Sequence, residues 1–589
     1  MADHPYPSLD DLRRAVDVAA GRREGDLLLR GGRVLNVFDG SWERADVLIA
    51  GPLVAAVGDL ADAEAERVED LDGATLAPGL IDGHVHVESS LVTPARYAAA
   101  VLPRGVTGAV CDPHEIANVA GVPGVRWLLA GTRGLPFDVW VTVPSCVPST
   151  TLETAGAELG VGEIDDLLAD PWVVGLAELM SFPDVIEGAF DQLAKVAVAE
   201  AQRKTTEGHA PGLGGRRLQA YLAAGVGSDH ECVTLEEGRA KLRAGAFLMV
   251  REGSVSRDLD ALLPLVDPVH ADRIGFVTDD RLPNDLLDEG GVDVLVRRAI
   301  RSGVPPAYAV RCASWNTARH YGLARRGAIA PGYYADLARV DDVDAWHVDL
   351  VLRHGREAAR AGRLTTTVAE PNSDDTSVRA TVRLPALTDG ALQPGAPRRS
   401  GAAVRVIRPV PGQIVTEALT LTPTVRDGRV VADPERDLAL LACVERHGRR
   451  GGIGTGLVSG LGLRRGALGS SVGHDHHNLM LAGADEADMR LAASRIAELG
   501  GGLVVVDAGR VLAELPLEIA GLVSSAPIEQ VRDGLDAVEA AARWLGVTQS
   551  GVMMTLSFLG LAVIPSLRLT DLGLVDVVAA RVVPFEVAA

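Results

Sequence analysis

Residues 80–322 alternate short apolar runs with amphipathic helical stretches, and this alternation restricts the fold more than any other feature of the chain. The apolar runs include TGAVCD, DVWVTVPS, VVGLAE and RIGFVTDD, and the helical stretches include AFDQLAKVAVAEAQRK and TLEEGRAKLRAGA. Such alternation over about 240 residues matches the size of a (β/α)8 TIM barrel. We therefore predict a barrel over residues 78–322, with a doubly wound open sheet as the alternative.

Both flanks of this region have a strand pattern. After a short amphipathic helix at the N-terminus, residues 26–76 show short apolar runs separated by Gly, Asp and Pro, which is typical of small antiparallel strands. Residues 327–364 return to the same pattern. Because chain segments that flank a barrel often meet, we expect residues 1–77 and 323–366 to form one small β-sandwich domain.

The rest of the chain predicts a linker and a third domain. Residues 367–400 are rich in Thr, Ser, Pro and Gly and are expected to connect the parts. Residues 401–589 are expected to form an additional C-terminal α+β domain, in which GGLVVVDAGRVLAELPL is predicted to be a hairpin. A length of 589 residues agrees with several domains.

Charge and cysteine content exclude several classes of protein. The formal net charge of −22 repels phosphate backbones, so we expect no nucleic-acid partner. Five dispersed cysteines without a CxxC pair indicate neither a disulfide framework nor a structural zinc site. No apolar run is long enough to cross a membrane, and the N-terminus lacks the apolar core of a signal peptide. We therefore expect a cytoplasmic protein without a membrane partner.

The first candidate site is the segment APGLIDGHVHVESS, which contains His84 and His86. Residues i and i+2 of a strand point to the same face, so the two imidazoles lie side by side at the end of an apolar run. At the carboxyl end of a barrel strand they would suit Zn, Mn or Fe. The alternative is a pair of exposed histidines at a strand end.

Further candidate ligands close later apolar runs of the same region. They are Glu178 in VVGLAELMSF, His209 in EGHAPGL, His230 in GVGSDHECV, and Asp279 in RIGFVTDDR. A single acidic residue at a strand end is more often a helix cap or an ion-pair partner. Together with the HxH pair, however, they form the series HxH, Glu, His, His, Asp, which indicates a metal centre at one end of the barrel.

These segments carry a family resemblance. The stretch PGLIDGHVHVESSLVTPARYAAAVLPRGVTGAVCDPHEIANV resembles the amidohydrolase superfamily and, within it, the adenine deaminase family of bacteria. GHAPGL, SDHE, REGS, TDDR and the late MTLSFLGLAVIPSLRLTDLGLVDV are similar to segments of the same family, so the resemblance runs from about residue 26 almost to the C-terminus. It implies that strand 1 supplies His84 and His86. Many relatives have a carboxylated lysine on strand 4, where this chain has Glu178.

The resemblance implies hydrolytic deamination of adenine to hypoxanthine and ammonia, a reaction of purine salvage, with two divalent ions. Mn²⁺ or Fe²⁺ is expected in preference to Zn²⁺. One ion would be held by His84, His86 and Glu178. Glu178, together with His209 and His230, would hold the second. Asp279 would ligate and would also move the proton of the attacking water.

Two further groups are less specific. His114 and Glu115 in CDPHEIAN are candidate proton-shuttle or substrate-contact residues, with a loop histidine bonded to backbone as the alternative. His474 and His477 in SSVGHDHHNLM are expected to contact the substrate or an extra cation, unless the cluster is a solvated loop. His476 departs from the family pattern, which usually has a small residue there.

Other chemistries fit the sequence less well. Cytidine-type zinc deaminases need a PCxxC motif that this chain lacks. GGIGTGLVSG does not match the GxGxxG pattern of a dinucleotide site. The remaining alternatives are an amidohydrolase acting on another aminopurine or a cyclic amide, and a non-catalytic barrel scaffold. The small-molecule substrate would be adenine, and a homo-oligomer is compatible with the extra domain.

Overall fold

The apolar runs of residues 80–280 form parallel strands that curl into a half-barrel. The structure is a computed structural model that describes residues 5–371, 374–399, 401–411 and 413–587. One set of strands pairs in the order β10-β9-β8-β7-β6-β14 and a second in the order β11-β12-β13. The bounds are β6 Leu80–His86, β7 Val106–Cys111, β8 Asp138–Val143, β9 Val173–Leu179, β10 Thr205–Gly208, β11 Ser228–Asp229, β12 Phe247–Arg251, β13 Ile274–Val277 and β14 Asp279–Asp280. Because β6, β7 and β8 are buried throughout, they read as continuous apolar runs instead of alternating ones.

The two sets of strands contact one another at both of their ends. A single residue, Thr278, separates β13 from β14; β13 pairs with β12, whereas β14 pairs with β6. At the other end, the Gly227 backbone N–H, just before β11, donates to the Thr206 carbonyl of β10 at 2.9 Å. The chain therefore returns to its first strand at Asp279.

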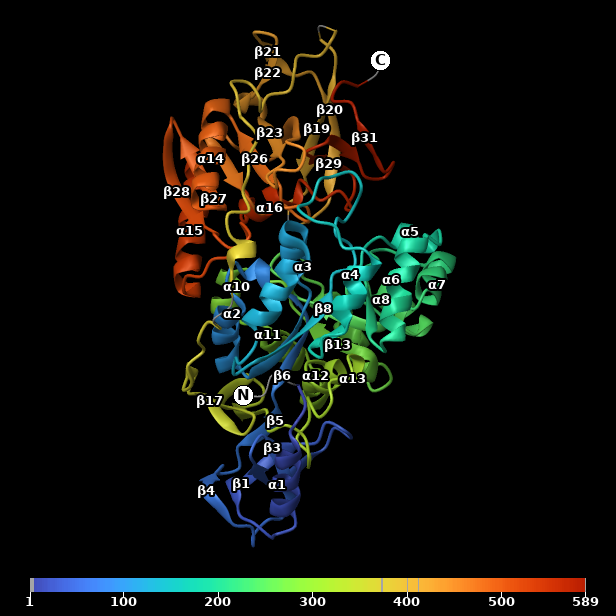
Figure 1. Cartoon of the computed structure of the whole chain (residues 1–589), viewed down its shortest axis with the longest axis vertical. Helices are drawn as coiled ribbons and strands as arrows, with labels where there is room; N and C mark the ends of the chain where they lie inside the picture. The colour runs from blue at the N-terminus through green and yellow to red at the C-terminus, as the bar shows by residue number, and fades with distance from the viewer. Residues whose placement is uncertain (1–4, 372–373, 400, 412, 588–589) are drawn as a thin grey trace.

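Helices cover the outer side of these strands (Figure 1). They are α2 Pro94–Val101, α3 His114–Gly131, α4 Val161–Leu168, α5 Phe182–Ile186, α6 Phe190–Ala201, α7 Gly215–Ala223, α8 Leu235–Ala244, α9 Leu259–Leu262, α10 Pro283–Asp288, α11 Asp293–Arg301, α12 Pro306–Cys312 and α13 Trp315–His320. Local sequence sets their ends: in α8 the Thr234 side chain accepts from the Glu237 N–H, and Gly245 ends the helix at φ +102°.

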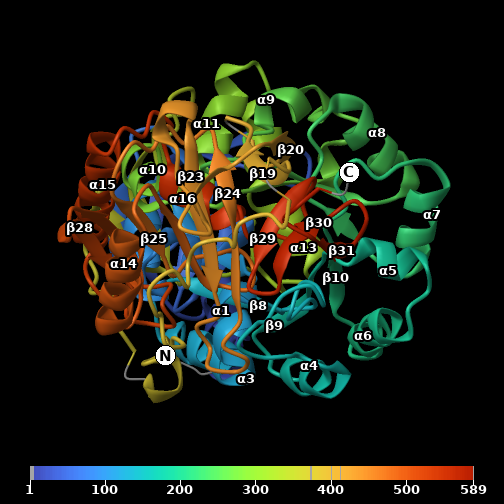
Figure 2. The same ribbon diagram turned by 90° about the horizontal axis from the view of Figure 1, so that it is seen from above.

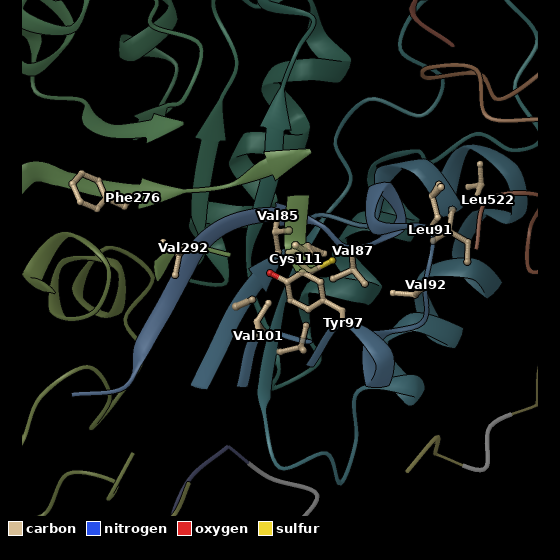
Figure 3. Packing of buried hydrophobic residues seen from close by; sticks show 14 of the residues in the cluster. Val85, Val87, Leu91, Val92, Tyr97, Val101, Cys111, Phe276, Val292 and Leu522 are labelled. Atoms are coloured by element: carbon tan, nitrogen blue, oxygen red, sulfur yellow. The ribbon is translucent and has the colours of Figure 1, made fainter. Parts of the chain in front are cut away.

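Beneath these helices, apolar side chains of the helices and strands pack against one another. Figure 3 shows Tyr97 of α2 beside Val85 of β6 and Cys111 of β7, and all three are almost completely buried. Burying one such side chain contributes roughly 1.5–3 kcal/mol. The strand ends that carry the polar candidate ligands are thus supported by a well-packed core.

The segments on either side of the barrel region meet in one sheet. Its order is β18-β17-β16-β15-β5-β1-β2-β3, with β4 on β1. Antiparallel pairing of Ala338 with Ala77 joins the two flanks. The helix α1 (Leu9–Ala19), which the sequence predicts, packs on this sheet. The bounds of its strands are β1 Gly25–Leu35, β2 Trp42–Ala50, β3 Leu53–Gly58, β4 Ala65–Asp70, β5 Thr75–Pro78, β15 Leu337–Asp342, β16 His347–Arg353, β17 Arg356–Arg360 and β18 Arg363–Leu364.

A separate C-terminal domain follows the connecting segment, in whose described residues 367–371 and 374–399 only Thr376–Val378 form a helical turn. The domain's main sheet has the order β20-β19-β24-β23-β26-β25-β27-β28, and the predicted hairpin is β27–β28. The elements are β19 Val404–Pro409, β20 Thr416–Leu421, β21 Thr424–Arg426, β22 Arg429–Val431, β23 Leu438–Val444, β24 Ile453–Ser459, β25 Ala467–Ser470, β26 Leu479–Gly483, α14 Glu486–Leu499, β27 Gly502–Asp507, β28 Arg510–Pro516, α15 Ile528–Trp544, α16 Val552–Phe558, β29 Leu567–Thr570, β30 Gly573–Asp576 and β31 Arg581–Val583.

The C-terminal domain lies on the barrel region (Figures 1 and 2). Met554 and Phe558 of α16 pack with Leu561 and Ile564 against Val255 and Leu282 of the barrel loops. The Thr154 N–H donates to Asp571 Oδ1 at 2.9 Å across the same junction. Within the described part of the chain, no helix is long and apolar enough to span a bilayer.

Candidate active site and metal centre

The ends of the parallel strands bring six predicted side chains together. The carboxyl ends of parallel strands share one edge, so residues that close successive strands converge there. Two of the side chains end β6, one lies on β9, two directly follow β10 and β11, and one begins β14. All are at most 13% exposed. They are His84, His86, Glu178, His209, His230 and Asp279.

Glu178 lies at the centre of this group. Its Oε2 is 2.6 Å from His209 Nδ1 and 3.2 Å from His230 Nε2. Its Oε1 is 3.5 Å from His86 Nε2. The two oxygens of one carboxylate therefore face two different sets of imidazoles, as a bridging ligand between two cations would.

The HxH pair and Asp279 form the other half of the group. His84 Nε2 lies 3.2 Å from His86 Nε2, and Asp279 Oδ1 lies 3.0 Å from the latter and 3.9 Å from the former. Ligand atoms about 2.0–2.2 Å from one ion lie at such separations from each other, so the donor set fits a divalent metal. Asp279 adopts φ +58°, a conformation that costs energy for a residue other than Gly and is common at functional sites.

The charges of the group favour ionised carboxylates. Burial raises the pKa of Glu178, but the charges and hydrogen bonds of His209 and His230 outweigh burial and hold this pKa well below its usual range. Burial likewise acts against ionisation of Asp279, whose pKa is held low by His86 and Arg251. Two anionic groups among buried imidazoles are the donors that Mn²⁺, Fe²⁺ or Zn²⁺ would take.

Outer partners orient the two imidazoles of β6. His84 Nδ1 donates to Glu207 Oε2 at 2.8 Å, and His86 Nδ1 donates to the Asp112 carbonyl at 3.0 Å. Each ring therefore directs the free Nε2 lone pair to the centre. The sequence analysis did not include Glu207, although it lies in the short run TTEG, two residues before His209.

Arg251, at the end of β12, was also missed. Its Nη1 donates to Asp279 Oδ2 at 2.9 Å, and the same guanidinium pairs with Glu231. Asp279 Oδ2 is thus held by a cation, while Oδ1 faces the HxH pair. The motif REGS contained this arginine, but its spacing gave no sign of the contact.

His114 and Glu115, at the start of α3, point in different directions. His114 Nδ1 lies 3.3 Å from Glu178 Oε1 and 3.1 Å from Asp112 Oδ2, so His114 borders the six predicted ligands. Glu115 instead accepts from Ser89 Oγ at 2.7 Å. Only the first of the two touches the six predicted ligands in the contacts of the described residues.

The C-terminal domain supplies the histidine cluster that the sequence singles out. His474 is buried and lines the cavity over the six predicted ligands, and with His477 and Glu115 it forms a further group that could hold an ion. His477 Nδ1 accepts from the Gly473 N–H. His476 Nδ1 accepts from the Asn478 N–H, and its Nε2 lies against Gly560, away from the cavity.

The cavity itself has walls from both domains. Side chains of both domains crowd it, so that its free interior is about 60 Å³. The barrel contributes His86, His114, Glu178, Met180, His209, His230, Glu231, Arg251, Ser256, Asp279 and Asp280, and the C-terminal domain contributes Ile414, His474, Asp475, Phe558, Leu561, Val563 and Ile564. The His474 and Phe558 rings stack with centroids 4.9 Å apart and an angle of 18° between their planes.

Comparison with known proteins gives a consistent result over the whole chain. Residues 75–372 match the model of the amidohydrolase family, and residues 413–581 match that of the adenine deaminase C-terminal domain. An adenine deaminase of Kosmotoga olearia is 42% identical over 96% of this chain and 97% of its own length. Those of Desulfatibacillum aliphaticivorans and Methanothrix thermoacetophila are 45% and 46% identical, over 97% and 95% of this chain and 98% and 97% of theirs. This chain belongs to the adenine deaminase family and has the amidohydrolase fold.

Proposed function

We propose that this protein hydrolyses adenine to hypoxanthine and ammonia with two divalent ions, in purine salvage. The observation that carries the proposal is the position of Glu178, whose Oε1 faces His86 of the HxH pair and whose Oε2 faces His209 and His230. Relatives that match nearly the full chain are named adenine deaminases.

We assign one ion to His84, His86 and Glu178, and the second to Glu178, His209 and His230, with Asp279 as a further ligand. Bound there, the ions would supply the Lewis acid that makes water nucleophilic at neutral pH. Histidine and carboxylate donors suit Mn²⁺ and Fe²⁺, which we propose in preference to Zn²⁺.

Asp279 moves the proton in this proposal. Arg251 holds Oδ2, so Oδ1 takes the proton of the attacking water and passes it to the ring nitrogen or to the departing amine. His114 borders Glu178 and serves the same proton path. Glu115 holds the loop through Ser89 and so supports the proton path indirectly. His474, in the cavity wall, contacts the base, and His477 lies behind it. An extra cation on these two histidines is the alternative.

We also propose that the two sets of parallel strands close into a complete (β/α)8 barrel over residues 78–322. The Gly227–Thr206 hydrogen bond and the pairing of β14 with β6 support closure. The flanking strands, residues 1–77 and 323–366, would fold as a small β-sandwich. Support comes from Ile49 of β2 and Leu352 of β16, which share one apolar cluster although several strands lie between them in the sheet. Residues 367–400 would be the linker and 401–589 the C-terminal domain.

The direct test is turnover by protein stripped of metal and reloaded with Mn²⁺ or Fe²⁺. We expect release of ammonia and hypoxanthine from adenine, and little turnover of adenosine or a cyclic imide. Faster turnover of the imide or of another aminopurine would replace the substrate assignment. Fewer than one bound ion per chain, without activity after metal addition, would favour a non-catalytic scaffold. Three bound ions per chain would support the extra cation on His474 and His477.

A further inference from the structure

One carboxylate in the wall over the metal-ligating group has an oxygen without a partner. Asp475 belongs to the loop between β25 and β26 of the C-terminal domain, and its side chain is 6% exposed. Its Oδ1 lies 3.7 Å from both His114 Nε2 and His474 Nδ1. Its Oδ2 is buried and forms no hydrogen bond with the described residues. A buried acceptor left unpaired costs stability until a water molecule or a ligand donates to it.

The carboxylate remains an acceptor because of its surroundings. Burial raises the pKa of Asp475, but hydrogen bonds and charges of His114 and His474 on either side lower it well below the usual range. Glu153, a further nearby charge, is buried and has its own pKa raised to about 8 by burial, so it is largely neutral at neutral pH. An ionised carboxylate accepts hydrogen bonds and donates none.

The rest of the same wall is apolar or aromatic. Phe558 stacks on His474, and Ile414, Leu561 and Ile564 complete the surface that the C-terminal domain presents to the cavity. Among the described cavity-lining residues of this domain, Asp475 is the one carboxylate. A flat base held between such a wall and the strand ends would meet one charged acceptor on the side of the C-terminal domain.

The orientation of adenine follows from the chemistry of the proposed function. Its amino-bearing carbon must lie beside Glu178 and Asp279, so N9, which is bonded to C4 across the fused rings, lies farther from the metal-ligating group than N7. In the free base the five-membered ring carries one N–H, whereas in adenosine the nitrogen is blocked by ribose. The N–H is the one hydrogen-bond donor at that end of the molecule.

We propose that the Asp475 carboxylate accepts the hydrogen bond of the N9–H of the five-membered ring, so that the C-terminal domain selects the free base over nucleosides. This inference rests on the proposed function and adds a specificity-determining residue to it. A site built to bind one N–H rejects the analogue that lacks it, because the buried acceptor is then left unpaired.

The test compares adenine with 9-methyladenine, which has no ring N–H, in metal-loaded full-length protein. We expect Asp475→Ala to lower kcat/KM for adenine about 10- to 100-fold, the loss typical of a hydrogen bond to a charged group. The inhibition constant of 9-methyladenine should stay unchanged or fall, and the metal content should stay that of the wild type. Asp475→Asn, which keeps the side-chain volume, serves as the second variant and should lose adenine activity in the same sense.

His476→Asn is the matched control, because His476 is a buried neighbour in the same loop that faces Gly560 and not the cavity. It should leave both constants unchanged. If the Asp475 variants lose kcat/KM for adenine and affinity for 9-methyladenine by the same factor, the role of Asp475 is structural and the inference is overturned. Unchanged adenine kinetics in these variants would also overturn it. Wild-type protein that fails to deaminate adenine would instead refute the proposed function.

Discussion

Replacing Glu207 by Gln gives the sharpest test of how the metal centre is built. Glu207 is fully buried and does not belong to the six predicted ligands, yet its Oε2 holds His84 Nδ1 at 2.8 Å. The substitution keeps the side-chain size but removes the negative charge that fixes the ring and increases the basicity of Nε2. Loss of such an outer partner lowers metal affinity about 10- to 100-fold, or about 1.4–2.7 kcal/mol. A hydrogen bond to a charged group contributes about 1.5–3 kcal/mol, which agrees with that range.

The assay is competition for Mn²⁺ between the metal-free protein and a fluorescent chelator. Glu486→Gln is the matched control, because Glu486 is also a buried carboxylate in an ion pair, 2.9 Å from Arg490, but lies on α14 of the C-terminal domain. We expect weaker Mn²⁺ binding in Glu207→Gln alone. Equal affinities in the wild type, Glu207→Gln and Glu486→Gln would refute the role of Glu207 in orienting His84.

Three further predictions concern Asp279, the metal centre and His320. Asp279→Asn should lower kcat for adenine about 10²- to 10⁴-fold, because the proton acceptor is lost; a smaller effect in a steady-state assay would assign the proton transfer to another group. Removing the metal with a chelator should abolish turnover, and adding Mn²⁺ back at about 100 times its Kd should raise the free energy of unfolding by about 2.7 kcal/mol for each site that binds only the folded chain; calorimetry that detects no stabilisation would contradict a buried metal centre. Burial lowers the pKa of His320, which stacks on Phe247, to about 3. In the unfolded chain His320 therefore takes up a proton near pH 6.5, whereas in the folded chain it stays neutral. The free energy of unfolding falls as the pH decreases from about 6.5 toward 3. In urea unfolding of metal-free protein, the free energy of unfolding of His320→Phe should fall less over this pH range than that of the wild type. Identical pH profiles of the two proteins would disprove the role of His320.

The sequence predicted the curled parallel sheet and the candidate ligands for a common reason. His84, Glu178 and Asp279 each close a buried apolar run, and the ends of parallel strands share one edge. A local pattern therefore specified a long-range arrangement. The hairpin β27–β28 was predictable on the same basis, because both strands and the turn lie within one short segment.

Contacts between distant segments could not be predicted in this way. Nothing near Arg251 in the chain indicates that its guanidinium reaches Asp279, because the contact depends on the twist of adjacent strands. The position of Asp475 beside His114 depends on how the C-terminal domain rests on the barrel region. The sequence singled out His474 and His477 in the histidine-rich loop, and of these two His474 lines the cavity.

The cavity wall formed by Phe558, Leu561 and Ile564 has a consequence for the time at which the protein becomes active. These residues are synthesised long after His84 and His86, because they lie far later in the chain. A nascent chain that has already folded its strands would hold the metal-ligating side chains beneath an open mouth. The cavity wall would form only after the C-terminal domain has been synthesised, so a product that stops before this domain would retain the six predicted ligands without that wall.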